Sequence, residues 1–501
     1  MNQKTIARER PSWPLVIGVM LMVLLEALDT TVVNVALPHM KGSFAATSDQ
    51  ITWMITAYLV STAIVMPLTG YLVKKFGQRE ILNFGVVGFI LASVACGFSS
   101  TLESMVFFRF LQGGLGAVVV PISQSIMFKA FSSEKRSQAM SFWGIALMVG
   151  PLIGPVTGGW ITENWNWPWI FFINVPIGII AVLLISGKLD PELDKTKVTT
   201  DWFGLVALSL TLGALQMLLD QGHTRDWFES SFIWFLGWLT GTGFVLFYVH
   251  AIKAKESIVD VRLFSDRNFL VGSLLMAGYG MAMYSTIVLL PLQAQEVMGY
   301  PADIAGWILT PRGAVSAVLM IIVGTYLAPK VDGRFLMIIG LILSFFASLM
   351  MAKFPLALDT QGFILPGVVM GVGMALVWSQ LSVATFETIP ENKSSEAAGL
   401  FNVMRVMGGS IGIAISSTLL VRREQVHWNH FGQHIYASNP DLSRWLDSSR
   451  MNLEEISTLV RLADEIMSHV QVAAFNDTFY FISLVFLLMI PLPLLFSPKE
   501  N

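Results

Sequence analysis

Residues 137–161 read Ser137-Gln-Ala-Met-Ser-Phe-Trp-Gly-Ile-Ala-Leu-Met-Val-Gly150-Pro151-Leu-Ile-Gly154-Pro155-Val-Thr-Gly158-Gly159-Trp-Ile161. The stretch holds no charged side chain, and a helix of this length crosses a hydrocarbon layer of roughly 30 Å. Glycines 150, 154 and 158 share one helix face, which lets another helix approach closely, and the two prolines bend the helix. We predict a transmembrane hinge or a tight helix contact here; ordinary small-residue packing is the alternative.

Apolar blocks of this kind fill the whole chain. Of 501 residues, 54% are hydrophobic and 13% are charged, whereas soluble domains carry about 25% charged residues. A chain that lies largely within a lipid bilayer accounts for this excess of hydrophobic residues. The predicted spans are 15–37, 51–73, 80–98, 105–128, 137–161, 168–187, 203–220, 231–252, 268–291, 302–327, 335–354, 361–384, 396–420 and 474–497.

Lysine and arginine set the expected orientation, because cytoplasmic loops retain positive residues. One set of alternate loops is rich in them, whereas the short loops opposite carry only Lys41, Arg225 and Lys353. We therefore expect a multi-pass protein of a bacterial inner membrane with both termini in the cytoplasm. The long segment 421–473 then faces outward, and the spacing of apolar residues in Leu453–Val472 predicts a small helical hairpin within it. That loop is either a docking surface or a solvated connector.

Two similar stretches predict an internal repeat. Gly70-Tyr-Leu-Val-Lys-Lys-Phe-Gly-Gln-Arg79 ends the second span, and Gly324-Thr-Tyr-Leu-Ala-Pro-Lys-Val-Asp-Gly-Arg334 ends the tenth. This fits two six-helix bundles related by a parallel repeat. The expected division is an N-terminal bundle at 1–187, two inserted helices with linkers at 188–267, and a C-terminal bundle at 268–501.

Ionisable residues inside the spans are the candidate functional groups. Glu26 and Asp29 lie three residues apart in the first span and share a helix face. Acidic groups at that depth cost roughly 2.5–3.5 kcal/mol on an insertion scale and normally mark ion or substrate pathways. Glu26 is predicted to couple protons or substrate, or to form a structural hydrogen bond. For Asp29 the alternative is a local polar network with Thr30, Thr31 and Asn34.

Three arginines within the spans also have either a functional or a structural role, because a guanidinium keeps its charge and must lie next to an acid or a water-filled cavity. Arg109 shares a face of the fourth span with Gln112, and it either tunes a nearby carboxyl as part of a proton switch or forms a structural pair. Arg312 and Arg405 occupy the predicted second bundle. We expect the substrate cavity to be lined by Asn34, Gln112, Arg312 and Arg405.

A basic turn lies at the end of the second predicted span. Gly70, Lys74, Lys75, Gly77 and Arg79 form a tight basic turn, either a conformational latch or a consequence of topology alone.

Three further features limit the kind of chemistry. His427, His430 and His434 are spaced to chelate a metal if helical, the alternative being solvent-exposed histidines. The single Cys96 permits no intrachain disulfide and is expected to be a small buried residue. A net charge of −3 offers no basic surface for nucleic acid. The scattered polar residues form neither a catalytic set nor a cofactor fingerprint, so we expect no enzyme and no cofactor.

The sequence resembles the major facilitator superfamily, and within it the fourteen-helix drug:proton antiporters of the EmrB/QacA type. The similarity covers essentially the whole chain. It is carried by Leu28-Asp29-Thr30-Thr31-Val-Val-Asn34-Val-Ala36-Leu37-Pro38, Gly70–Arg79, Arg109-Phe-Leu-Gln112-Gly113, Gly150–Gly159, Trp169-Ile-Phe-Phe-Ile-Asn174-Val-Pro176-Ile-Gly178, Asp201-Trp-Phe-Gly204, Gln295-Glu296-Val-Met-Gly299 and Arg405-Val-Met-Gly408-Gly409-Ser-Ile-Gly412.

The resemblance implies roles for these motifs. Asp29 and Arg109 join Glu26 in the proton-coupling set, and the loop after span two becomes the cytoplasmic gate. The interbundle hinge is expected at Gly150, Pro151, Gly154, Pro155, Gly158 and Gly159. One departure is Lys74, which stands where the family has an acidic residue that favours a charge-paired latch with the adjoining bundle. The EmrB-like branch also implies a periplasmic adaptor and an outer-membrane channel as partners.

We therefore expect export of small amphipathic molecules from the lipid bilayer or cytoplasm, in exchange for protons, by alternating access of the two bundles. Two alternatives remain open: a dedicated carrier for one metabolite or siderophore on the same fold, and a membrane sensor or scaffold that transports nothing.

Overall fold

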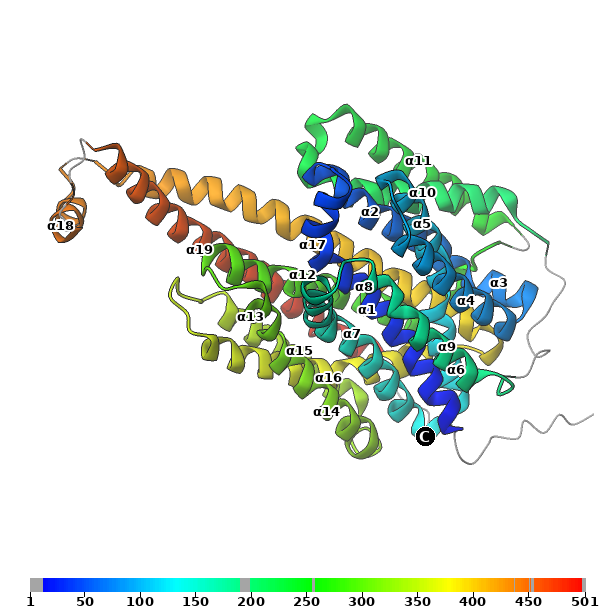
Figure 1. Cartoon of the computed structure of the whole chain (residues 1–501). Coiled ribbons are helices and arrows are strands. Elements are labelled where there is room, and N and C mark those ends of the chain that lie inside the picture. The colour runs from blue at the N-terminus through cyan, green and yellow to red at the C-terminus, as the bar shows by residue number, and fades with distance from the viewer. Residues whose placement is uncertain are drawn as a thin grey trace, which may run out of the picture.

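The computed structural model describes residues 12–189, 199–254, 257–436, 438–449, 451 and 455–497, and throughout these it contains helices but no strands (Figure 1). Thirteen helical stretches of the described chain are long and apolar enough to cross a membrane, and Trp169–Ile185 is a shorter apolar one. These correspond one for one to the fourteen predicted spans, so the expected all-α, fourteen-span fold is confirmed. Both termini, predicted to be cytoplasmic, lie outside the described residues.

The first nine α-helices pack chiefly on one another. Their bounds are α1 Trp13–Ser43, α2 Ser48–Val65, α3 Thr69–Phe76, α4 Gln78–Gly97, α5 Leu102–Gly116, α6 Val119–Ala130, α7 Arg136–Asn164, α8 Trp169–Phe172 and α9 Asn174–Ile185. Helix α1 lies along α7 and also contacts α6 and α9, while α5 packs on α2 and α4. Pro67 separates α2 from α3, because proline has no N–H with which to continue the helical hydrogen bonds. We call this group the first half.

The second half is built from the helices after residue 266. They are α12 Arg267–Leu292, α13 Ala302–Trp307, α14 Thr310–Ile322, α15 Gly333–Met351, α16 Ile364–Phe386, α17 Ser394–Gly432, α18 Pro440–Ser449 and α19 Ile456–Met489. Helix α12 lies along α17, and α16 packs between α14 and α15. Asp266 begins α12 by accepting a hydrogen bond from the backbone N–H of Phe269 at 2.8 Å, which satisfies one of the free donors of the first helical turn.

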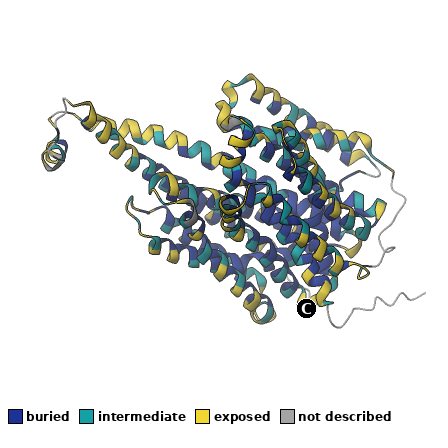
Figure 2. Ribbon diagram, in the orientation of Figure 1, coloured by how far each residue is buried: buried dark blue, intermediate teal, exposed yellow. Residues whose placement is uncertain are grey.

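The inserted pair consists of α10 (Trp202–Gly222) and α11 (Ser231–Lys253). Helix α10 packs on α2 of the first half and on α17 of the second. Ser410 of α17 donates to Gln216 at 3.0 Å, and Thr56 of α2 hydrogen-bonds Asp220. Helix α11 lies at the outside of the molecule, and much of its surface is exposed (Figure 2). Of the two inserted helices, α10 is thus the one that packs against both halves.

Helices α17 and α19 extend far beyond the rest of the molecule, with α18 at the tip (Figure 1). Much of the predicted loop 421–473 is therefore helical, which differs from the expected long connector and extends the predicted hairpin. Residues 413–431 and 456–489 contain neither glycine nor proline, so nothing in the sequence stops either helix at the membrane surface. Asp477 of α19 binds His427 at 2.8 Å and Arg423 at 3.2 Å, which ties the two helices together. We call this projection the stalk.

The glycine stripe of α7 determines how closely α1 is held. A Cβ atom added at Gly154 would lie 2.1 Å from the Thr31 hydroxyl, and one added at Gly150 would lie 2.5 Å from Cβ of Ala27. The opposite side of α7 meets the second half, where a Cβ on Gly313 of α14 would lie 2.6 Å from Leu152. The stripe thus fixes a contact within the first half, and α7 itself lies between α1 and α14.

We expect Gly154→Ala to lower the free energy of unfolding by about 1–3 kcal/mol, because the added methyl has no space against α1. The matched control is Gly159→Ala, whose new Cβ would lie 3.6 Å from Val35, an ordinary contact; this change should be neutral or mildly stabilising. Thermal unfolding of both purified variants in mild detergent measures the difference. Equal melting temperatures would contradict the assigned α1–α7 contact.

Candidate functional site

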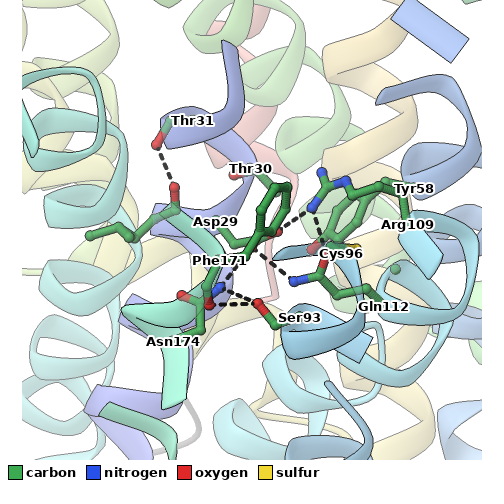
Figure 3. A network of polar contacts seen from close by, with 12 residues as sticks. Asp29, Thr30, Thr31, Tyr58, Ser93, Cys96, Arg109, Gln112, Phe171 and Asn174 are labelled. Carbon is green, nitrogen blue, oxygen red and sulfur yellow. Dashed lines mark hydrogen bonds and ion pairs between the residues drawn. The ribbon is translucent and has the colours of Figure 1, made fainter. Parts of the chain in front are cut away.

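A closed polar cluster lies within the first half, built from α1, α5 and α9 around Asp29 (Figure 3). Arg109 donates to one carboxylate oxygen of Asp29 at 2.6 Å. The other oxygen accepts from Gln112 at 2.9 Å and from Asn174 at 2.8 Å. The Asp29 carboxylate is thus neutralised by one cation and held by three donors.

The surroundings of this cluster exclude water. Asp29 and Arg109 are each 1% exposed, and Gln112 and Asn174 are fully buried. The guanidinium lies over the Tyr58 ring at 4.3 Å, an arrangement that favours a cation. An ion pair in so dry a place is retained only when its geometry satisfies both charges.

The partners of Asp29 differ from the sequence prediction. Thr30 and Thr31 donate their hydroxyls to backbone carbonyls of Ala27 and Leu28, one turn earlier on the helix, as threonines within helices commonly do. Asn34 is exposed and does not join the cluster. The predicted local network is therefore wrong.

Sequence reasoning assigned no role to three members of this cluster. Asn174 bonds Asp29 and donates to Ser93 at 2.9 Å, and the Cys96 thiol lies 3.7 Å from Gln112. Cys96 is buried, as expected. A polar asparagine within the apolar sixth span was the one signal available for Asn174.

Glu26 lies one helical turn before Asp29 but outside its hydrogen bonds. The side chain is 8% exposed. Asp29, Tyr58 and Arg405 are all close enough to act on its carboxyl group electrostatically. Arg405 belongs to α17 of the second half, so a cation of the second half acts electrostatically on Glu26.

The two arginines of the second half have different surroundings. Arg405 donates to the Tyr284 hydroxyl and, at 3.2 Å, to Asn402. Asn402 in turn donates to Gln124 of the first half at 2.6 Å. Arg312 lines a small cavity between α7 and α14. The four residues predicted to line one cavity therefore fall in separate places, with Gln112 inside the Asp29 cluster and Asn34 exposed.

The predicted gate residues meet the second half directly. Lys74 of α3 forms an ion pair with Glu396 in the first turn of α17, and the Glu396 side chain is 3% exposed. A Cβ on Gly70 would lie 2.5 Å from Cβ of Glu396, so glycine is required for this approach. Lys74, which stands where the family has an acidic residue, thus forms an ion pair with the second half in which the first half carries the positive charge.

Further polar contacts between the halves surround that ion pair. They are Ser125 with Ser394 at 2.8 Å, Gln380 with Ser137 at 2.9 Å, and Arg136 with Glu391 at 3.3 Å. Lys75 donates to Tyr71 and to Thr200 of the linker, each at 2.9 Å. Gly77 has a φ of 98°, a conformation that favours glycine. Arg79 is half-buried in the first turn of α4. This end of the molecule is closed.

The stalk histidines do not converge on a common point. His427 pairs with Asp477, while His430 and His434 contact each other edge to face. The part of the chain that the structure describes holds no group of three or more His, Cys, Asp or Glu side chains able to bind a metal ion. The spacing that predicted chelation here is thus a helix face exposed to solvent.

Fourteen spans in two halves, with ionisable side chains enclosed between membrane helices, are typical of a membrane transporter. The sequence profile of the Major Facilitator Superfamily matches residues 19–413, and the chain belongs to this superfamily. It is thus a multi-pass membrane protein of a transporter family rather than an enzyme family.

Several curated proteins are similar over almost their whole length. The fatty acid resistance protein FarB of Neisseria gonorrhoeae is 35% identical over 480 residues, which cover 95% of this chain and 94% of FarB. The multidrug export protein EmrB of Haemophilus influenzae is 34% identical over 477 residues, covering 94% and 93%. EmrB of Escherichia coli K12 is 33% identical over 481 residues, covering 95% and 93%.

A solved structure supports the fold independently. The human organic anion transporter MFSD10 superposes with a TM-score of 0.63 over 97% of this chain and 100% of its own, at 16% identity. At that identity the likeness concerns the fold alone.

Asp29→Asn should lower the free energy of unfolding by about 3–5 kcal/mol, because it leaves the Arg109 charge buried without a counter-charge. The double variant Asp29→Asn/Arg109→Gln should recover most of that loss. Thermal unfolding in detergent tests both, with Glu103→Gln at the exposed start of α5 as a control for loss of one acid. A double variant no more stable than the single one contradicts the pairing.

Lys74→Glu should open the closed end, because it places two carboxylates against each other. The readout is disulfide formation between Ser125→Cys and Ser394→Cys, introduced into a Cys96→Ser background. We expect the cross-linking rate to fall at least tenfold in Lys74→Glu and to return within threefold in Lys74→Glu/Glu396→Lys. Lys330→Glu, an exposed lysine of the second half, is the charge-matched control; a swap that fails to restore cross-linking excludes an ion-pair latch.

Proposed function

We propose that this chain is a proton-coupled exporter of hydrophobic and amphipathic small molecules that works by alternating access in a bacterial inner membrane. The observation that carries the proposal is Glu26: an almost fully buried carboxyl group at membrane depth, next to Tyr58 and Asp29 and within electrostatic reach of Arg405 from the other half. A carboxyl group at that depth is costly unless it serves an ion or substrate pathway. Its electrostatic interaction with Arg405 allows protonation to alter how the two halves meet.

The two acids of α1 divide the task. Asp29 is neutralised by Arg109 and held by Gln112 and Asn174, so it maintains the charge balance and the shape of the first half. Glu26 has no such cage and serves as the proton-loading group. Protonating Glu26 removes its attraction for Arg405, which weakens one tie between the halves and biases the conformational equilibrium.

The relatives favour broad export over a dedicated carrier. Two are named for multidrug export and a third for resistance to fatty acids. The cavity between the halves includes Met148, Met283 and Met374, and flexible methionines suit varied ligands. The dedicated metabolite or siderophore carrier remains the second candidate. Substrate-driven collapse of a proton gradient in inverted vesicles separates the two: a response to only one compound class of a broad lipophilic panel favours the dedicated carrier.

The stalk supports the further proposal of an envelope-spanning assembly. Its two long helices carry α18 well away from the membrane-spanning part, and their projecting ends are mostly exposed (Figure 2). The distribution of lysine and arginine among the loops predicts that this projection lies on the periplasmic side. A periplasmic adaptor that leads to an outer-membrane channel fits it there. A chain with α18 replaced by a short glycine-serine turn should keep transport in vesicles but lose resistance in whole cells. Unchanged cellular resistance would remove the stalk from the proposed assembly.

Glu26→Gln should reduce proton-driven export at least a hundredfold in proteoliposomes, because the group that loads the proton is gone. Energy-independent exchange of substrate across the membrane should persist, since Gln keeps the size of the side chain. Glu26→Asp is the control and should retain measurable coupling. Full proton-dependent export by Glu26→Gln or by Glu26→Gln/Asp29→Asn would overturn the coupling assignment, and absence of any transport by the parent would favour the sensor or scaffold.

A further inference from the structure

Three arginines lie buried at membrane depth, and they differ in their counter-charges. Arg109 is paired with Asp29 at 2.6 Å, and Arg405 acts on Glu26. The side chain of Arg312, which is 7% exposed, has no hydrogen bond and no ion pair within the described chain, and Tyr279 is the one titratable group close enough to act on it. Arg312 is therefore a buried cation whose counter-charge the protein does not supply.

The Arg312 side chain faces a small cavity between the halves. The cavity has a volume of about 20 Å³, room for little more than one water molecule. Its walls come from α7, α12, α14 and α16 and include Met148, Leu152, Met283, Ser316 and Met374. No carboxylate lines it, so one cation and otherwise mainly apolar side chains surround the space.

The neighbouring polar groups offer protons rather than negative charge. The Tyr279 hydroxyl is buried without a hydrogen-bond partner in the described chain, and the Ser316 hydroxyl donates to the Gly313 carbonyl at 2.9 Å. A guanidinium left without a counter-charge in an apolar setting is costly. The ligand that satisfies it is an acceptor that carries negative charge.

The apolar walls indicate the rest of the ligand. Met148 and Leu152 belong to α7 of the first half, whereas Met283 and Met374 belong to the second, so the cavity widens when the halves separate. Methionine side chains adapt to ligands of different shape. An alkyl chain gains from these contacts, while an inorganic anion gains only from the arginine.

We propose that Arg312 forms a subsite for the carboxylate or other anionic head of an amphipathic substrate, whose apolar tail lies among Met148, Leu152, Met283 and Met374. The inference rests on the proposed export function and adds to it the preferred charge of one substrate class. Arg312 is thereby a specificity-determining residue, distinct from the proton-loading Glu26. Cationic and neutral amphiphiles use the apolar walls without the arginine.

The test uses ligands of equal chain length and different charge. Dodecanoate and dodecyltrimethylammonium are measured for binding to the purified full-length chain in a neutral detergent and for export in proteoliposomes. We expect Arg312→Gln to weaken dodecanoate binding at least tenfold and to leave dodecyltrimethylammonium within threefold of the parent. Arg312→Lys, which keeps the charge, should bind both ligands within threefold of the parent. Arg225→Gln removes an arginine from an exposed turn far along the chain from α14, and it serves as the matched control for the loss of one positive charge.

Stability provides a readout that does not depend on transport. Removing an uncompensated buried charge should leave the melting temperature of Arg312→Gln equal to or above that of the parent, in contrast to the loss expected for a paired arginine. Dodecanoate should raise the melting temperature of the parent but not of Arg312→Gln. A strong loss of stability in Arg312→Gln would show that the arginine has a structural partner and would overturn the proposal.

The remaining outcomes are distinct. Equal weakening of both ligands in Arg312→Gln, or unchanged dodecanoate binding, contradicts the anionic subsite. If 100 mM chloride or phosphate stabilises the parent through Arg312 while dodecanoate does not, the site takes an inorganic anion and the amphiphile proposal is wrong. A parent that exports the cation but does not bind dodecanoate refutes this inference alone, whereas a parent that exports neither refutes the proposed function.

Discussion

A guanidinium at membrane depth keeps its charge, so Arg109 constrains every helix around it. The arginine lies on α5, and its counter-charge Asp29 lies on α1, while the donors that complete the carboxylate come from α5 and α9. Three helices are thereby fixed against one another, and the glycine stripe of α7 holds α1 from its other side. The same arrangement leaves Glu26 outside the cage. The Asp29 carboxylate is therefore held by these bonds, and its neighbour Glu26 is the acid for which we propose proton loading.

The closed end depends on a charge pair whose polarity can be exchanged. An acid on the α3 side of the gate is the family pattern, but Lys74 meets Glu396 here and keeps an attraction between the halves. Coulomb attraction depends on the product of the two charges and not on which side carries which sign. The requirement that does not change is Gly70, because any side chain at that position would collide with Glu396.

The sequence was sufficient for the spans, because the thickness of a bilayer fixes the length of each apolar block. It was not sufficient for partners such as Lys74 and Glu396, which lie 322 residues apart and show no shared periodicity. Asn174 was missed for the same reason, and Asn34 was placed in a cavity because helical spacing alone does not tell which side of a helix faces the interior. The apolar spacing of Leu453–Val472 predicts only a small helical hairpin in the stalk, because hydropathy separates lipid from water and does not give the length of a helix in water. The long runs without glycine or proline were the signal for its helices.

The inserted helices are attached to both sides of the gate. Before α10, Thr200 accepts from Lys75 of the first half at 2.9 Å; after α11, the backbone N–H of Asp260 donates to Glu396 of the second half at 2.9 Å. Lys393 adds a 2.7 Å bond to Asp260, and its hydrogen bond and charge outweigh the effect of partial burial, so the pKa of Asp260 lies below its ordinary value. Any rotation that parts α3 from α17 must detach one of these anchors or drag the inserted pair along. The insert thus spans the contact between the two halves, and parting them carries the cost of breaking these bonds or of moving the inserted pair.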